Sequence, residues 1–197
     1  MTFLKKQSTA IAITVIIAVL FSFIGCSLSL SRQAGKVEDM FTTGVYLDEE
    51  SYVQPSIQSQ LDKSAEAGLG LVTICNHYPE LSLEAEAITE ARRELLEAES
   101  YDEKYIAYTH YYKTVSSLID LLKEGEVITD GELVVKLTDD DFEAFESYAG
   151  TVTGANGVIE KSEYNKKVTA FIRAKRSFPA NIFGIFADEP DYFQVEG

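Results

Sequence analysis

Few residues in this chain are of types that perform chemistry. Its 197 residues include two histidines, His77 and His110, and two cysteines, Cys26 and Cys75. Cys75 and His77 are two positions apart, which places them on different faces of a helix, so they do not form a nucleophile and base pair. The sequence has no histidine pair at metal-ligand spacing, no HExxH, no GxSxG and no glycine-rich phosphate loop. We therefore predict that the chain is not an enzyme and binds no cofactor.

A short acidic run at 138–141 reads Thr-Asp-Asp-Asp. It lacks the alternating ligands and the glycine that an EF-hand calcium loop needs, so we predict no metal site. Thr138 and Asp141 instead have the spacing of a capping box, and aspartates suit the positive end of a helix dipole. The run therefore predicts the start of a helix.

The overall composition limits the class of protein and its partners. The formal net charge is −15, and a chain this acidic is repelled by the phosphates of nucleic acids. Hydrophobic residues make up 46% of the chain, which is enough for a packed core. The length suits one domain plus an appendage.

The appendage is the N-terminal stretch. Lys5 and Lys6 precede an uncharged run at 7–31, and its apolar part from Ala10 to Leu30 would span about 30 Å as a helix, the thickness of a hydrocarbon core. The two lysines favour a cytoplasmic N-terminus. We predict a membrane anchor at 1–31 and an extracytoplasmic domain at 32–197.

Two chemistries fit this anchor. One is an uncleaved transmembrane helix. The other is a lipoprotein signal, because the run Phe-Ile-Gly-Cys that ends at Cys26 resembles a lipobox, with Cys26 as the lipid attachment residue. Both leave the rest of the chain tethered to the outer face of the cell membrane, as a single-pass or lipid-anchored protein.

The exported part has helical periodicity. Residues 32–75 predict helix with a break near Gly44, and Ser82 is placed to cap a helix that continues to Lys123, about 60 Å long. That helix carries a heptad stripe, typical of the seam of a helix pair or of self-association. The stripe consists of Tyr101, Tyr105, Tyr108, Tyr112, Val115, Ile119 and Leu122.

The stretch after this helix predicts a hairpin. Asp130-Gly131 lies between the β-branched runs 126–129 and 132–135, which is the strongest short hairpin signal. The next helix contains Gly150, Gly154 and Gly157, and we expect these glycines either to allow close approach of another helix or to mark a local distortion. Together the patterns predict an all-α fold, an antiparallel bundle of long helices with a small β-hairpin between the last two.

The C-terminal residues carry a recognisable pattern. Tyr-Asn is followed three positions later by an apolar residue, six later by an aromatic, and then by Phe-Pro, with a final Tyr-Phe. This resembles the C-terminal signature of the LemA family. The residues are Tyr164, Asn165, Val168, Phe171, Phe178, Pro179, Asn181, Phe186, Tyr192 and Phe193.

The resemblance implies a transmembrane segment followed by a helical bundle outside the cytoplasm, and it implies no reaction. The usual second Tyr-Asn of the family is replaced here by Phe171-Ile172, so the chain looks like a divergent member. We expect an interaction scaffold that binds other envelope proteins through its signature residues. The alternative is an extracytoplasmic ligand-binding or sensor module anchored as a lipoprotein.

Overall fold

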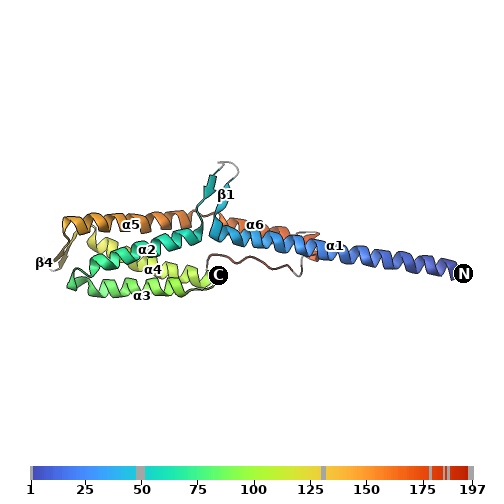
Figure 1. Ribbon diagram of the computed structural model, residues 1–197, viewed down its shortest axis with the longest axis horizontal. Coiled ribbons are helices and arrows are strands. Elements are labelled where there is room, and N and C mark those ends of the chain that lie inside the picture. The colour runs from blue at the N-terminus through green and yellow to red at the C-terminus, as the bar shows by residue number, and fades with distance from the viewer. Residues whose placement is uncertain are drawn as a thin grey trace. The chain divides into compact units, whose positions relative to one another are not determined.

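The computed structural model describes residues 2–47, 52–129, 132–177, 179–183, 185 and 187–194, and they are mostly helical (Figure 1). The predicted all-α class with a small hairpin is confirmed. The elements are α1 (Thr2–Thr43), β1 (Val45–Leu47), β2 (Tyr52–Gln54), α2 (Ile57–Cys75), the 3₁₀ helix η1 (Pro79–Leu81), α3 (Ser82–Glu97), α4 (Tyr101–Leu122), β3 (Glu126–Thr129), β4 (Glu132–Lys136), α5 (Asp139–Glu160), α6 (Tyr164–Lys175) and α7 (Ala180–Phe183).

The chain divides into two compact units. The anchor unit comprises Met1–Met40 and Asn165–Asp191, and the bundle unit comprises Phe41–Tyr164 and Tyr192–Gly197. Segments far apart in sequence therefore fold together in both units.

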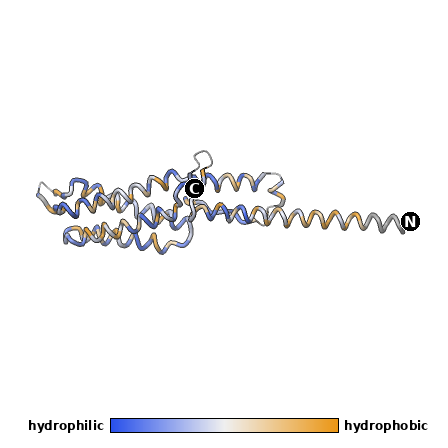
Figure 2. The backbone as a smooth tube through the Cα atoms, turned by 45° about the horizontal axis from the view of Figure 1, so that its top comes forward, coloured by the Kyte–Doolittle hydropathy of each residue, from blue (hydrophilic) through white to orange (hydrophobic). Residues whose placement is uncertain are grey.

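The first half of α1 has the surface of a membrane helix. Every residue from Ala10 to Ser22 is exposed, and the helix is long and apolar enough to cross a membrane. Figure 2 shows the apolar residues along this stretch. The hydroxyls of Thr14 and Ser22 donate to the carbonyls four residues earlier, at 3.0 and 2.9 Å. Polar groups in lipid require such internal partners.

The second half of α1 is covered on one side. Leu30, Ala34 and Val37 are buried at steps of three and four, which is the spacing of one helix face. Helix α6 lies beside this part of α1 in both views, and its Val168 and Phe171 are buried as well (Figures 1 and 2). The anchor unit is thus a helix pair in which only α1 continues into the exposed apolar run.

In the bundle unit, α2 lies closest to α5 and α3, and glycines make this possible. A Cβ at Gly68 would lie 2.2 Å from the hydroxyl of Tyr111, and a Cβ at Gly70 would lie 2.5 Å from the ring of Tyr148. The Tyr111 hydroxyl donates to the carbonyl of Ser64 at 2.5 Å. Large aromatic side chains of α4 and α5 therefore rest directly on the α2 backbone.

The single helix predicted from Leu83 to Lys123 is wrong. The chain turns between α3 and α4, because Ser100 accepts from the Glu103 amide at 3.2 Å and the Glu103 carboxylate accepts from the Ser100 amide at 3.1 Å. This complete capping box starts a new helix. The heptad stripe is only partly the core face, since Tyr111 and Leu118, which lie outside it, are buried.

The break predicted near Gly44 is confirmed, but the strands that follow it were not predicted. Gly44 has φ +92°, and a Cβ there would lie 2.2 Å from the carbonyl oxygen of Gln54. Strands β1 and β2 pair antiparallel after it. Gln54 then donates to the carbonyl of Lys161 and accepts from the amide of Glu163, at 2.9 and 2.8 Å, which holds the hairpin against the end of α5.

The hairpin predicted between helices is confirmed as β3 and β4, between α4 and α5. Its Asp130 and Gly131 lie outside the described residues. Thr138 caps α5, with its hydroxyl accepting from the Asp141 amide at 3.2 Å. The close approach expected at Gly150, Gly154 and Gly157 is wrong, since nothing lies within 4 Å of a Cβ at any of them.

Gly68 contacts a neighbouring helix and Gly154 does not, so alanine substitutions at these two positions should have opposite effects on stability. Gly68→Ala should lower the free energy of unfolding by about 1–3 kcal/mol, because the new methyl displaces the Tyr111 ring. Gly154→Ala should raise it by about 0.5–1 kcal/mol, through helix propensity alone. Urea titration of the full chain in mild detergent, followed by circular dichroism, measures both. Equal effects of the two substitutions would contradict the packing described here.

Candidate functional site

The structure divides the C-terminal signature between the two units. Tyr164, Tyr192 and Phe193 lie in the bundle unit, and the other described members lie in the anchor unit. Tyr164, Val168, Phe171 and Phe193 are buried, Asn165 and Tyr192 are partly buried, and Pro179 and Asn181 are exposed. Phe178 and Phe186 lie outside the described residues. The signature therefore does not form one continuous surface.

Two signature residues of the bundle unit, Tyr164 and Phe193, belong to a cluster of aromatic rings around Phe41. The Tyr164 ring meets Phe41 edge-on at 5.6 Å, Tyr101 stacks on Phe41 at 4.2 Å, and Phe193 lies 5.5 Å from it. Phe193 also meets Tyr105 edge-on at 5.3 Å. Edge-to-face and offset contacts at these distances stabilise a core. Tyr164 and Phe193 thus close the bundle around the last turn of α1.

Cys26 lies within α1, where the helix continues without interruption from the exposed apolar run to Thr43. Its side chain is partly buried, like those of Phe23 and Ser27 on either side of it. Whether it carries lipid stays a prediction.

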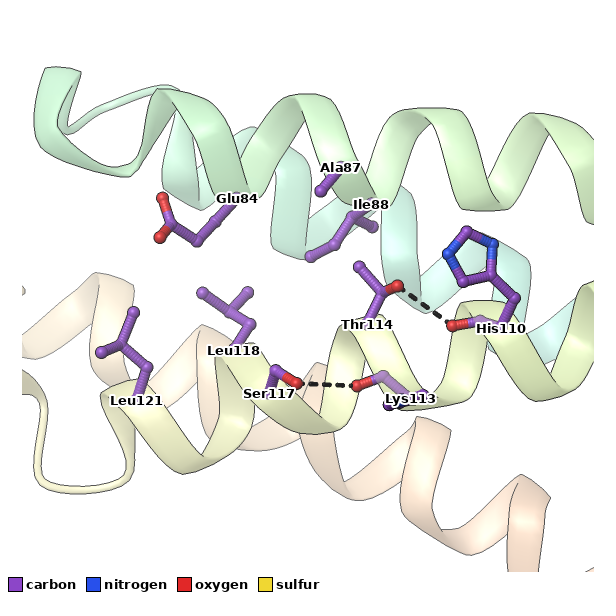
Figure 3. Close-up of a pocket in the computed structure, with 9 residues that line it drawn as sticks. All are labelled: Glu84, Ala87, Ile88, His110, Lys113, Thr114, Ser117, Leu118 and Leu121. Carbon is purple, nitrogen blue, oxygen red and sulfur yellow. Dashed lines mark hydrogen bonds between the residues drawn. The ribbon is translucent and has the colours of Figure 1, made fainter.

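A groove lies between α3 and α4 (Figure 3). Its volume is about 430 Å³, and apolar side chains from both helices form much of its lining. The lining residues are Glu84, Ala87, Ile88, His110, Lys113, Thr114, Ser117, Leu118 and Leu121. A groove between two helices with an apolar lining is the form that accepts a partner's helix.

The polar residues of this groove are not equivalent. Thr114 and Ser117 donate to carbonyls of their own helix at 3.0 Å. His110 pairs with Glu94 at 2.8 Å. Glu84 Oε2, in contrast, is shielded from solvent and has no hydrogen-bond partner among the described residues. Figure 3 shows the Glu84 carboxylate directed into the groove from α3. A buried acceptor without a donor favours binding of a group that supplies one.

Cys75 is not placed to act as a nucleophile. It is fully buried, and burial raises the pKa of its thiol to about 11, with a further increase from the nearby Glu84 carboxylate. The reactive form of cysteine is the thiolate, which a pKa this high suppresses at neutral pH.

His77 takes part in a network that joins α2 to α5. Its Nδ1 lies 3.1 Å from Asp141, and the Tyr78 hydroxyl donates to the same carboxylate at 2.8 Å. The Thr138 amide donates to Tyr78 at 2.9 Å. The hydrogen bond from Tyr78, together with those from His77 and Thr138, lowers the pKa of Asp141. The second half of the predicted capping box is thus replaced by contacts to the end of α2.

Within the described ranges, no group of three or more histidine, cysteine, aspartate or glutamate side chains is placed to hold a metal ion. The acidic run at 139–141 instead forms the first turn of α5.

Neither protein-family models nor curated proteins match this chain. The resemblance to the LemA family therefore rests on the C-terminal motif alone.

Sequence reasoning missed the groove and the unpartnered carboxylate. Glu84 reads as a dipole-complementing residue in the first turn of a helix, and nothing in its spacing shows that an oxygen is buried. The capping box formed by Ser100 and Glu103 could have indicated the groove from sequence. It starts a new helix, and the turn at that point brings α3 and α4 side by side.

The Asp141 network predicts a pH-dependent contribution to stability. A pKa below the unfolded value of about 3.9 means that the ionised carboxylate stabilises the fold at neutral pH, and that this is lost as pH falls through the lower folded pKa. Asp141→Asn should lower the free energy of unfolding by about 1 kcal/mol at pH 7 and should leave it almost unchanged in strong acid. Denaturant titrations across this range measure it. The exposed Asp140→Asn is the control, and an identical pH profile for both variants would contradict the assignment.

Proposed function

We propose that the chain is a membrane-anchored cell-envelope protein of the LemA type that acts as a helical interaction scaffold. Helix α1 supports the anchor, because no residue that the structure describes covers its apolar run from Ala10 to Ser22, and such a surface is unfavourable in water. Lys5 and Lys6 favour a cytoplasmic N-terminus, so the bundle unit lies outside the cytoplasm.

The observation that best supports the scaffold function is the position of Glu84 in the α3–α4 groove. An apolar groove with a buried, unpartnered carboxylate complements a helix that presents aliphatic residues and one lysine or arginine. The cation would pair with the partly exposed Glu84 carboxylate, while the aliphatic residues would cover Leu121.

Non-enzymatic action is part of this proposal. Cys75 is a buried neutral thiol, and His77 contacts Asp141 in the network that links α2 to α5. His110 is bound to Glu94 on the groove wall. The described residues therefore use their candidate reactive groups for packing and hydrogen bonding.

The alternative function for such an anchored domain is a ligand-binding or sensor module, and the same groove would bind its ligand. An amine-bearing small molecule would meet Glu84 in the same way as a partner's lysine. Its affinity would not depend on a partner chain, which separates the two functions experimentally.

The uncleaved form of the anchor is the one we propose. Phe23 is partly buried in line with Cys26 and Leu30, and lipoprotein processing before Cys26 would remove it. Cys26→Ser should therefore leave the protein in the membrane fraction after alkaline carbonate washing, with the intact mass of the whole chain. A parent protein whose mass lacks 1–25 and carries lipid, beside a Cys26→Ser variant of full-length mass, would establish the lipoprotein instead.

The scaffold predicts partners that depend on the groove. In-cell crosslinking and affinity capture of the full-length protein should recover reproducible envelope partners, and Leu121→Glu should remove them by placing a second carboxylate in the groove. Leu83→Glu is the matched control, because Leu83 is exposed on α3 and does not line the groove.

Both exposed substitutions should change stability by no more than about 0.5 kcal/mol, which thermal unfolding checks. Loss of partners from both variants would place the interaction elsewhere. No partners from any form, with a thermal shift by amine ligands that Glu84→Gln abolishes, would favour the sensor.

A further inference from the structure

The anchor unit contains a second element that reaches the level of the membrane. Helix α6 starts at Tyr164, whose ring meets Phe41 near the end of α1. It then runs back beside α1 for about 17 Å at 1.5 Å per residue, a length that on α1 leads from Phe41 back to Leu30. Lys175, the last residue of α6, thus lies at the level where the apolar run of α1 ends.

The chain continues past this level before it returns. Helix α7 and Ile185 follow Lys175, and the chain turns back through Ala187. Figures 1 and 2 both show this turn beside α1. On α1, the residues that precede Leu30 change from fully exposed to partly covered at Phe23, Cys26 and Ser27. Protein therefore covers one face of the last turns of the apolar run.

Two aliphatic side chains of this turn are exposed. Ile182 is 43% exposed and Ile185 is 65% exposed, and no acidic residue occurs between Arg176 and Ala187. Two aliphatic side chains beside the apolar end of a membrane helix would face water only if the membrane ended below Phe23. The run from Ala10 would then supply about 20 Å, too short for a hydrocarbon core of about 30 Å.

A hollow in this turn combines charge with an apolar wall. Its volume is about 240 Å³, and it is lined by Lys175, Arg176, Asn181 and Ile185. Glu189 pairs with Lys175 at 3.1 Å and with Arg176 at 3.6 Å. Lys175 also donates to the carbonyl of Ala187. Lys175 is mostly buried by these contacts, whereas the Arg176 side chain is 73% exposed and extends outward.

We propose that the turn formed by Lys175, α7 and Ile185 docks into the outer interface of the same bilayer that α1 crosses. Ile182 and Ile185 enter the upper acyl region, and Arg176 and Asn181 bind the phosphate of a phospholipid headgroup. Glu189 leaves little net charge beside the hydrocarbon, so the lipid phosphate and not a strongly anionic surface is the ligand. The protein would then hold the membrane at two points, α1 and this turn, and could not rotate freely about α1.

The inference rests on the proposed membrane anchor, and the experiment separates the two. The chain has no tryptophan, so a single introduced tryptophan reports one position. Three variants are made in a full-length Cys26→Ser background: Val15→Trp in the apolar run, Ile185→Trp in the turn, and Leu83→Trp in the bundle unit. All three positions are exposed in the structure, which limits the effect on folding. Circular dichroism and thermal unfolding verify that each variant is folded.

The variants are reconstituted into phosphatidylcholine and phosphatidylglycerol vesicles whose acyl chains carry bromine near the ester end or near the methyl end. Bromine quenches tryptophan on contact. Ile185→Trp should emit at shorter wavelength than Leu83→Trp and lose about half its intensity to ester-end bromine, as expected for a depth of about 5–10 Å. Val15→Trp, about 7.5 Å along α1 from Ala10, should also be quenched by bromine in the acyl chains, and Leu83→Trp should be quenched by bromine at neither end.

Each result decides between the two claims. Quenching of Val15→Trp but not of Ile185→Trp overturns the docked turn and leaves the anchor intact. Quenching of neither overturns the anchor as well. Quenching of Ile185→Trp mainly by methyl-end bromine overturns the interfacial placement, because the turn would then lie deep in the bilayer. Ile182→Trp repeats the measurement if Ile185→Trp is unstable.

Discussion

Helix α1 has two kinds of surface, one exposed on all sides and one covered on one face, and the rest of the structure depends on the change between them. From Ala10 to Ser22 its side chains are exposed on every face, and its polar side chains are bonded within the helix, as lipid requires. From Leu30 to Val37 one face is buried, as a folded protein requires. A single helix can satisfy both only if a second segment covers it from a defined residue onward, and α6 with the turn that follows it provides this cover.

The aromatic core at one end of the bundle unit forms around the last turn of α1. Phe41 is the centre of a ring cluster that takes Tyr101 from α4, Tyr164 from the start of α6 and Phe193 from the C-terminal segment. Lys104 lies over the same ring, 5.6 Å from its centroid. Three segments distant in sequence, α4, the start of α6 and the C-terminal segment, thus contact the last turn of α1. The aromatic residues of the C-terminal motif therefore have a structural role, whatever partner the protein binds.

Much of the fold was predictable, and the errors have physical causes. The uncharged run, the Thr138 cap and the Asp130-Gly131 hairpin are local signals, and the elements they predict are present. The error at Ser100 arose because the heptad spacing of tyrosines continues across a capping box that breaks the helix. The glycine error arose because composition shows where a helix lacks side chains but not which face meets a neighbour; Gly68 makes the close contact and Gly154 makes none. Burial of Glu84 Oε2 depends on the packing of α3 against its neighbours, which no local pattern contains.

The change of environment along α1 is the central claim, and it is measurable residue by residue. Single spin labels at successive positions from 10 to 37, in full-length Cys26→Ser protein reconstituted in bilayers, report collisions with oxygen, which enters lipid, and with a water-soluble nickel complex. The structure predicts uniform oxygen access from 10 to 22, followed by a period of about 3.6 residues with minima at Phe23, Leu30 and Val37. A helical period within 10–22, or dominant collisions with nickel there, would show that protein or water surrounds this segment and would contradict the account.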